Sequence, residues 1–416
     1  MRTTFRREGR RPVRTTFLAQ ALAAIAAFTG AQAITEFPVP VSSSSPRGLT
    51  AGPGQTVWYG THSTQKIGRI DLTLLASCQA NANACMTEYP IPGATNATDP
   101  YNLVKGSDGA IWFTEGAGNK IGRLDPGKLT GCSTIPTNCI TGYASSPGMF
   151  PFNIALGPDG NVWFSDSAGI ARVDLTKLVG CETTPATCIT HYPITGNNPV
   201  PGQDGNVWCL LYSPSGIGRI DLSKLTGCQS DATKCLTSFP LPTNSHPDNA
   251  AAGPDGNIWF TDGPNVGRID LSALGSCSSG SCITEFPVST QPNTFLVNLT
   301  SGPDGGLWFL NSSTNMVERM STSGQVTNQY SIPTLQSGPQ RIRTGPDGNL
   351  WFTEGIGKIG RLNPSGGGGG NPTPTPTPTL AVSPTRTPTG TSSGPARGRV
   401  TPVRPPTPKS NIEGRS

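Results

Sequence analysis

The sequence is poor in charged residues and in histidine, and it has no long apolar run beyond its first 33 residues. Charged side chains make up 13% of the 416 residues, against about 25% in typical soluble domains. Because a transmembrane helix needs about 20 apolar residues, we expect no membrane span after residue 33. The 52 Gly and 41 Pro exclude a coiled coil or a bundle of long helices and favour short strands joined by tight turns.

The net charge of +5 comes from the two ends of the chain. Residues 1–33 carry six Arg and one Glu, and residues 364–416 carry five Arg and one Lys against one Glu. Each end contributes +5, which leaves −5 for residues 34–363. Because an acidic folded part is not suited to a phosphate backbone, we expect no nucleic-acid partner.

Residues 1–33 have the three parts of a secretory signal peptide. An arginine-rich start is followed by the apolar stretch Phe17–Phe28 and by a cleavage site at Ala31–Ala33. The twelve residues of this stretch are too few to span a bilayer, and a membrane anchor is the alternative. We therefore predict a secreted protein, periplasmic or extracellular, exported by the Sec or the twin-arginine route.

Cysteine spacing agrees with an oxidising compartment. Ten of the 11 cysteines form local pairs, four with six residues between the partners and one with four. Zinc sites use clusters of C-x₂₋₄-C motifs, often together with histidine, and the sequence has no such cluster. Cys209 is left over at a position that is mostly Phe in the other repeats, so we expect a buried free thiol. The predicted disulfides are Cys78–Cys85, Cys132–Cys139, Cys181–Cys188, Cys228–Cys235 and Cys277–Cys282.

The strongest signal is a sevenfold repeat, which contains every tryptophan of the chain. The seven Trp are 43 to 54 residues apart: Trp58, Trp112, Trp163, Trp208, Trp259, Trp308 and Trp351. Each follows a turn of the GPDGN kind, precedes a string like KIGRID and, in most repeats, a later string like ITEFPVP. We interpret the arginine of the KIGRID-like string, present in every repeat, as a structural partner of neighbouring acids.

Four short strands per repeat at this period predict an all-β fold, a seven-bladed β-propeller over residues 34–363. The first ITEFPVP string, Ile34–Pro40, precedes the first Trp, whereas the last Trp repeat lacks such a string. We therefore predict that Ile34–Pro40 completes the blade of Trp351 beside Gly357–Leu362 and closes the ring. In the fourth blade, the short stretch between Thr195 and Gly202 leaves little room for a full innermost strand, so we expect that blade to be irregular.

Residues 364–416 change in composition. Five glycines at Gly366–Gly370 are followed by Pro-Thr repeats at Pro372–Thr379. Such a segment has too few apolar residues to form a core and favours extended polyproline II structure. We predict a disordered tail that acts as a spacer.

Three strings resemble those of the streptogramin lyases, also called virginiamycin B lyases. They are GPDGNLWFTE (Gly345–Glu354), KIGR (Lys358–Arg361) and ITEFPVP (Ile34–Pro40). The resemblance covers nearly all of residues 34–363 and implies a seven-bladed propeller, a fold that related non-enzymatic propellers share. Active members open the lactone ester of a cyclic depsipeptide by elimination, with a divalent metal, acidic residues and histidine. That chemistry needs a base for the proton α to a carbonyl and a cation for the developing enolate oxygen.

The family's catalytic histidines lie in P-H-x-I strings that enter the innermost strand. The corresponding positions here are Arg47, Tyr101, Phe152, Asp248 and Gln340. None is histidine, so we assign these five residues to a ligand-binding face. This loop face carries the connections from the second to the third strand and from the fourth strand to the next blade.

Acidic residues end the second strand in four repeats, also on the loop face: Glu115, Asp166, Asp262 and Glu354. Together they could ring Mg²⁺ or another divalent cation, and the alternative is a turn-capping role within each blade. His62 follows the second strand of the first blade, between the blades of Glu354 and Glu115. We therefore take His62, Glu115 and Glu354 as the catalytic candidates of a reorganised site.

Two functions remain open. The first is a secreted, monomeric binding propeller that holds a small-molecule, peptide or glycan ligand without the family's histidine-based catalysis or any cofactor. The second is a metal-dependent carbon–oxygen lyase that linearises a cyclic depsipeptide lactone. An apolar patch suited to a ligand is expected on the loop face. Its residues are Tyr101, Met149, Phe150, Phe152, Tyr212, Phe295 and Leu296.

Overall fold

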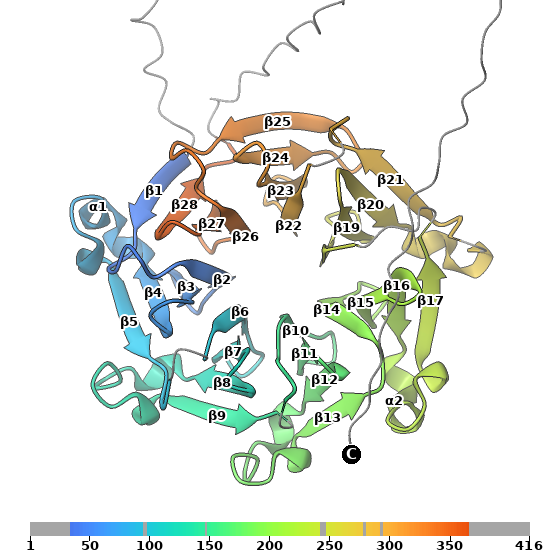
Figure 1. Ribbon diagram of the computed structural model, residues 1–416, viewed down its shortest axis with the longest axis horizontal. Coiled ribbons are helices and arrows are strands. Elements are labelled where there is room, and N and C mark those ends of the chain that lie inside the picture. Colours follow the sequence, from blue (N-terminus) through green and yellow to red (C-terminus); the bar gives the residue numbers. More distant parts are fainter. Residues whose placement is uncertain are drawn as a thin grey trace, which may run out of the picture. The chain divides into compact units, whose positions relative to one another are not determined.

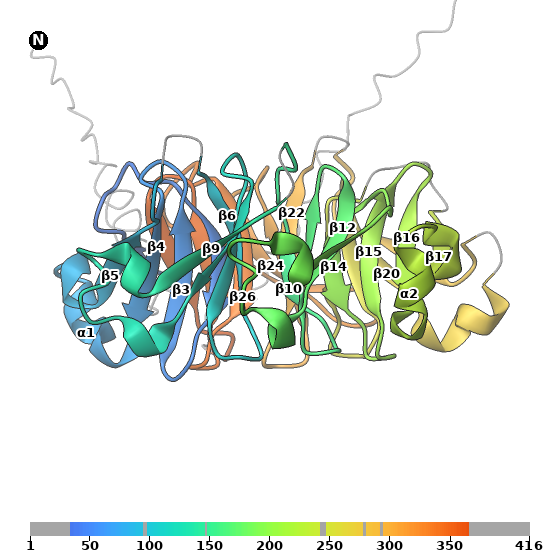
Figure 2. The same ribbon diagram turned by 90° about the horizontal axis from the view of Figure 1, so that it is seen from below.

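The computed structural model describes residues 34–94, 98–145, 148–241, 247–277, 280–291 and 294–365. The predicted signal peptide and all but the first two residues of the predicted tail lie outside this part of the chain. The described residues form seven antiparallel four-stranded sheets around a central axis (Figure 1). Seen edge-on, the strands run between two faces of the ring (Figure 2). The predicted seven-bladed propeller is confirmed.

Blades 1 to 6 run from an innermost to an outermost strand in chain order, and blade 7 takes β1 as its outermost strand. Blade 1 consists of β2 (Pro46–Ala51), β3 (Thr56–Thr61), β4 (Lys66–Asp71) and β5 (Met86–Pro90). Blade 2 consists of β6 (Pro100–Lys105), β7 (Ile111–Glu115), β8 (Lys120–Leu124) and β9 (Ile140–Ala144), and blade 3 of β10 (Ile154–Leu156), β11 (Val162–Asp166), β12 (Gly169–Val173) and β13 (Ile189–Tyr192). Blade 4 consists of β14 (Gly196–Pro201), β15 (Val207–Tyr212), β16 (Ser215–Ile220) and β17 (Leu236–Pro240). Blade 5 consists of β18 (Asn249–Ala252), β19 (Ile258–Asp262), β20 (Asn265–Ile269) and β21 (Ile283–Pro287). Blade 6 consists of β22 (Leu296–Ser301), β23 (Leu307–Asn311), β24 (Met316–Met320) and β25 (Val326–Ser331). Blade 7 consists of β26 (Pro339–Thr344), β27 (Leu350–Glu354), β28 (Lys358–Leu362) and β1 (Ile34–Pro38).

Short helical turns occupy the connections from the third to the fourth strand in blades 1 to 5, on the face opposite the loop face. They are α1 (Leu75–Cys78), α2 (Leu225–Cys228) and the 3₁₀ turns Leu72–Leu74, Ala82–Ala84, Pro126–Lys128, Pro136–Asn138, Leu175–Lys177, Pro185–Thr187, Leu222–Lys224, Ala232–Lys234 and Leu271–Ser276. The five predicted disulfides all lie in these connections. Cys209 is a buried free cysteine, as predicted.

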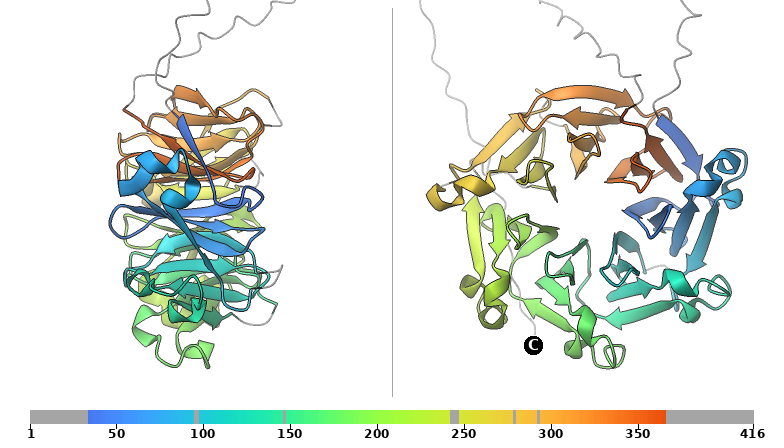
Figure 3. Two further views of the ribbon diagram at one scale, coloured as in Figure 1. Left: turned by 90° about the vertical axis from the view of Figure 1, so that its left-hand side faces the viewer. Right: turned by 180° about the vertical axis from the view of Figure 1, so that it is seen from behind.

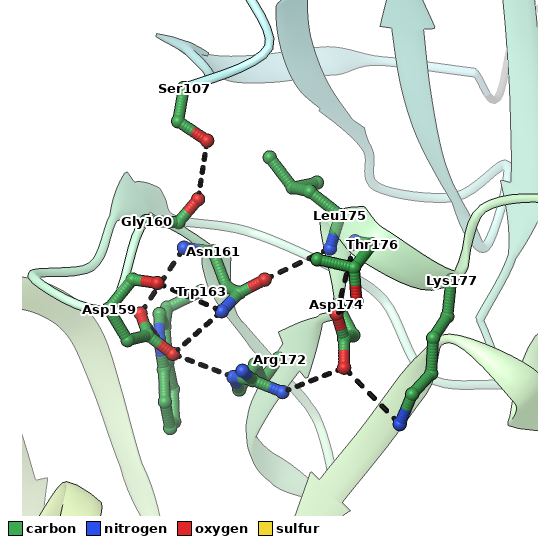
Figure 4. A network of polar contacts seen from close by, with 10 residues as sticks. All are labelled: Ser107, Asp159, Gly160, Asn161, Trp163, Arg172, Asp174, Leu175, Thr176 and Lys177. Atoms are coloured by element: carbon green, nitrogen blue, oxygen red, sulfur yellow. Dashed lines mark hydrogen bonds and ion pairs between the residues drawn. The ribbon is translucent and has the colours of Figure 1, made fainter.

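The GPDG turn and the third-strand arginine form one polar network in each of five blades, and blade 3 is typical (Figure 4). The turn places Gly160 at φ +73°, a conformation that glycine adopts without steric cost. Asp159 then accepts hydrogen bonds from the Trp163 indole N–H at 3.0 Å and from Nε of Arg172 at 2.7 Å. Arg172 also pairs with Asp174 at 3.6 Å. The repeated arginines and turn aspartates are therefore structural, as predicted.

Aromatic stacking packs each Trp against the outer part of the sheet. All seven indoles are fully buried, and each lies 5.5–6.0 Å from an aromatic ring of a fourth strand. The glycine of the KIGR string leaves room for the residue after Trp: a Cβ on Gly122 would stand 2.1 Å from the Phe113 ring. Five blades have glycine at this position, where it provides space rather than an unusual backbone angle, whereas blades 3 and 6 have Ala171 and Glu318 there.

The ring closes through the N-terminal strand. Strand β1 pairs antiparallel with β28, with Ile34 opposite Leu362 and Phe37 opposite Ile359, and the two lie side by side in Figure 3. Phe37 stacks on Trp351 at 5.8 Å, so the first strand supplies the aromatic partner that blade 7 lacks. The predicted closure is confirmed.

Two predictions need correction. The innermost strand of blade 4, β14, is full-length, with six residues as in β2, so the expected lack of room is wrong. The expected irregularity is present, because the pairing of β14 with β15 shifts register between Asn197 and Val200, as that of β2 with β3 also does. Leu296, predicted to be exposed, is only 1% exposed because it begins β22 and packs in the core between blades 5 and 6.

Candidate functional site

The start of the innermost strands gathers three predicted ligand-face residues at the mouth of the channel, on the loop face. Tyr101 of β6 and Phe152, just before β10, meet edge to face with ring centroids 6.1 Å apart. The guanidinium of Arg47 lies 5.7 Å from the Tyr101 centroid. Arg341 of β26 approaches the same ring at 5.2 Å. Cations at these distances are attracted to a tyrosine ring, so Tyr101 is held in place from several sides.

A chain of neutral hydrogen bonds runs beside these rings from blade 3 to blade 4. Asn153 donates to Oδ1 of Asn197 at 3.1 Å, and Asn197 donates from Nδ2 to the Tyr212 hydroxyl at 2.6 Å. Burial raises the pKa of Tyr212, the Asn197 hydrogen bond opposes this, and the charge of Asp248 adds to the rise. Tyr212 is therefore neutral at physiological pH, and its hydroxyl proton is left to donate to a ligand.

A cavity of about 220 Å³ opens between blades 3 and 4 beside this chain. Cavities that enclose a whole drug-sized molecule measure about 300–1,000 Å³, so this one suits a single ring or side chain of a larger ligand. The aromatic rings at its edge are partly exposed, Phe152 by 37% and Tyr212 by 41%. The lining residues are Phe152, Asp166, Ser167, Ala168, Gly169, Thr195, Gly196, Asn197 and Tyr212.

His62 pairs with a residue that sequence reasoning missed. Its Nδ1 lies 2.6 Å from Oδ1 of Asp99, and Arg47 donates to Oδ2 of Asp99 at 3.1 Å. His62 is in the loop after β3 and Asp99 precedes β6, so the pair joins blades 1 and 2. The one available signal was an acidic residue directly before the P-x-x-L string that starts at Pro100.

Asp166, at the end of β11, is held by groups of its own blade. Asp166 accepts from the backbone N–H groups of Ala168 and Gly169 at 2.8 and 3.1 Å. It also faces His191 of the fourth strand, whose Nδ1 is 3.3 Å away. For Asp166 the geometry is that of the turn-capping alternative.

Glu115 and Glu354 are buried, with exposed fractions of 3% and 0%. Burial raises the pKa of Glu115 to about 7, against the opposing charge of Lys120 in β8. Burial raises the pKa of Glu354 to about 8, with a further rise from Glu36 in β1 and an opposing effect of Lys358. The electrostatic neighbours of Glu354 thus lie in the outer two strands of blade 7. Among the interactions of the described residues, none joins His62 to Glu115 or Glu354.

These side chains do not fit the divalent cation that the family implies. Asp262, at the end of β19, is buried like the other three acids. Within the described part of the chain, no group of three or more His, Cys, Asp or Glu side chains could hold a metal ion. The four acids belong to four different blades, and Asp166 is already bound by its own turn. We therefore derive no catalytic step through a metal.

The remaining ligand-face residues complete the mouth. Asp248 lies just before β18 and is exposed. Desolvation by the surrounding protein nevertheless raises the pKa of its carboxyl group, and the positive charge of Arg341 opposes that rise. Gln340 of β26 lies against the turn after β27, where its Nε2 would be 3.2 Å from a Cβ on Gly355. The structure thus groups Arg47, Tyr101 and Phe152 directly and links Asp248 to them through Arg341.

None of the helices in the described residues has the length and hydropathy needed to span a bilayer. The sequence has no match among curated proteins.

Comparison with solved structures finds virginiamycin B lyase from Staphylococcus aureus at 27% identity and a TM-score of 0.62, over 79% of this chain and 98% of that one. A catalytically inactive histidine-to-alanine variant of that enzyme, solved with quinupristin, is 26% identical with a TM-score of 0.63, over 79% and 98% of the two chains. The extracellular domain of BT4673 from B. thetaiotaomicron shares the fold alone, at 15% identity and a TM-score of 0.56, over 79% of this chain and 42% of that one. A model of the virginiamycin B lyase family matches residues 15–139 and 145–378, well over half of the sequence, and the chain therefore belongs to this family.

Proposed function

We propose that this protein is a secreted propeller that binds a peptide-like ligand on its loop face without the histidine-based catalysis of its family. The observation that carries the proposal is the composition of the channel mouth. At positions where the resemblance implies catalytic histidines, Arg47 and Phe152 both pack against Tyr101. Five disulfides support secretion, because such bonds persist in oxidising compartments.

The chemistry of the mouth favours a ligand with aromatic and amide groups. Phe152 and Tyr212 offer ring surface, and Asn197 with the Tyr212 hydroxyl offers neutral hydrogen-bonding groups. The small cavity takes one ring while the rest of the ligand lies across the face. Quinupristin, with which a related lyase variant was crystallised, is the probe for this proposal.

A second candidate function is supported by the His62–Asp99 contact. A carboxylate that holds Nδ1 of a histidine fixes the tautomer and leaves Nε2 to act as a base. His62 is 37% exposed on its side chain, so a ligand on the loop face has access to it. The reaction would be ring opening of a depsipeptide lactone by elimination. His62 would take the proton α to the carbonyl of the residue whose side-chain oxygen forms the ester, the C–H electron pair would form a C=C bond, and the adjacent C–O bond would break to release the carboxylate.

Calorimetric titration of the secreted protein with quinupristin, alongside mass spectrometry of the ligand with and without Mg²⁺, separates the two functions. Binding without ring opening, lost in Phe152→Ser but kept in Ile135→Ser, would support the binding propeller. Ile135 is the control because it is an apolar residue that is 55% exposed and lies in the connection from β8 to β9, on the face opposite the loop face.

Ring opening that disappears in His62→Ala would instead establish the lyase. If neither quinupristin nor its linearised form binds, the proposed peptide-like ligand is wrong.

A further inference from the structure

The wall of the central channel is uniform in six blades and different in the seventh. Two residues before the GPDG turn, the innermost strand carries a small or neutral side chain in six blades and Arg343 in blade 7. Two residues earlier, it carries Gly or Asn in six blades and Arg341 in blade 7. The six counterparts are Thr50, Val104, Ala155, Val200, Ala251 and Thr300 for Arg343, and Gly48, Asn102, Asn153, Asn198, Asn249 and Asn298 for Arg341.

Arg341 reaches across the channel. It donates from NH2 to Oδ1 of Asn153 at 3.2 Å, and Asn153 belongs to blade 3, on the far side of the ring from blade 7. The side chain is 9% exposed. Its Nε is buried and has no hydrogen-bond partner among the described residues. A buried guanidinium N–H without an acceptor is costly, so this atom is one that a ligand could satisfy.

Arg343 lines a cavity of about 290 Å³ in the channel, and every other residue of the lining is neutral. The Arg343 side chain makes two hydrogen bonds with described residues, both from NH1: one to Oδ1 of Asn298 at 2.9 Å and one to the Ile342 carbonyl at 2.8 Å. Burial lowers the pKa of Arg343 to about 10, with a further effect of the Arg341 charge. Arg343 is therefore still charged at neutral pH.

Neither arginine has a counter-charge in contact. Within the described part of the chain, no ion pair involves Arg341 or Arg343, whereas Arg172 and its equivalents in most other blades pair with a turn aspartate. Asp248, whose pKa Arg341 influences, forms no ion pair with it in the same residues. Charged groups removed from water are normally paired or ligand-bound.

We propose that the central channel binds a small oxyanion, a phosphate, sulfate or carboxylate group, between Arg343 and Arg341. The guanidinium fork matches the oxygens of such groups, and the cavity has room for one of them with its waters. The anion supplies the missing counter-charge and an acceptor for Nε of Arg341. Arg343 lines this cavity below the mouth, whereas Arg341 also contacts Tyr101 of the loop face, so the anion site adjoins the peptide-like ligand without sharing its cavity.

The test measures thermal unfolding of the full secreted protein by tryptophan fluorescence in sodium phosphate, sulfate, acetate or chloride at equal ionic strength. We expect a saturable rise in Tm with at least one oxyanion and none with chloride. Acetate against phosphate distinguishes a carboxylate site from a phosphate site. Because sulfate stabilises most proteins by exclusion, the informative quantity is the difference between the wild type and the variants.

Arg343→Thr introduces the residue that blades 1 and 6 have at this position and should abolish the saturable rise in Tm. Arg343→Lys should raise the apparent Kd for the anion at least tenfold. Lys128→Thr, in an exposed turn, is the control and should respond like the wild type. Without anion, Arg343→Thr should match or exceed the wild-type Tm, because it removes an unpaired charge.

Two results would overturn the proposal. One is a wild type with no difference between oxyanions and chloride. The other is an Arg343→Thr protein that keeps the wild-type anion response, or whose Tm falls by the same amount at every anion concentration, which is the behaviour of a structural tether.

Discussion

The carboxyl group of Glu354 should make this protein less stable as the pH rises. It is fully buried, and neither of its oxygens has a hydrogen-bond partner among the described residues. The Ser337 hydroxyl, which is close enough to influence it, donates to Asn315 instead. Burial therefore raises the pKa of Glu354 from 4.5 to about 8, and the negative charge of Glu36 adds to the rise, while Lys358 opposes it.

The sign and size of the effect follow from proton linkage. Below pH 4.5 both states hold the proton; between 4.5 and about 8 only the folded state keeps it, so the free energy of unfolding falls as pH increases. The slope is about 1.4 kcal/mol per pH unit, which sets an upper limit of about 5 kcal/mol. We expect about 2–4 kcal/mol, because a buried carboxylate reorganises its surroundings and admits water.

Urea unfolding from pH 5 to 9, followed by tryptophan fluorescence, measures this effect in the wild type and in Glu354→Gln. The variant should have the flatter pH profile and should be the more stable protein above pH 8. Glu36→Gln is the contrasting variant. Burial acts to raise the pKa of Glu36, but hydrogen bonds from Lys358 and Thr334 lower it below its usual value. Its carboxylate therefore stabilises the fold above the unfolded pKa, and this variant should lose stability at neutral pH. Parallel profiles for Glu354→Gln and the wild type would refute the reasoning.

Three further predictions concern the scaffold. Phe37→Ala removes the ring that stacks on Trp351 at the closure and should cost about 3–5 kcal/mol in urea unfolding; a loss below 1 kcal/mol would mean that backbone pairing alone closes the ring. Gly122→Ala puts a methyl group 2.1 Å from the Phe113 ring and should cost about 1–3 kcal/mol, with partial recovery in the double variant that adds Phe113→Cys. Cys209 is buried and its thiol pKa is raised by burial to about 12, so iodoacetamide should label it, as seen by mass spectrometry, only in unfolded protein; labelling of the native state would contradict its burial.

The scaffold could be predicted from the sequence because its determinants are local and repeated. Trp163, the Asp159 turn and Arg172 lie within 14 residues, and their contacts recur in other blades. The closure was also predictable, since Ile34–Pro40 was the one outer strand without a blade of its own. Where the local pattern misled, as in β14, the spacing between Thr195 and Gly202 suggested too little room, yet a full strand forms with a register shift between Asn197 and Val200.

The site was less predictable because its contacts join distant segments. Asp99 reaches His62 from the next blade, and Arg341 reaches Asn153 across 188 positions of sequence. The end of a second strand can be located from its spacing to Trp, but the direction of the side chain there depends on the neighbouring outer strand. Asp166 turns toward His191 for that reason, which no periodicity in the sequence encodes.

In a ring of similar repeats, function is best sought where one blade departs from the others. Shared residues such as the turn aspartates have the same contacts in blade after blade, so they explain the fold rather than an activity. Departure alone is insufficient, however: Cys209 replaces an aromatic residue but is sealed between Gly196 and Gly218. Arg341 and Arg343 depart from six other blades; Arg343 also lines the channel cavity, and Nε of Arg341 is buried without a hydrogen-bond partner among the described residues. Six blades form the same architecture without an arginine at these positions, so the architecture does not explain the two positive charges of blade 7. A bound anion does explain them, because it supplies the counter-charge that both arginines lack.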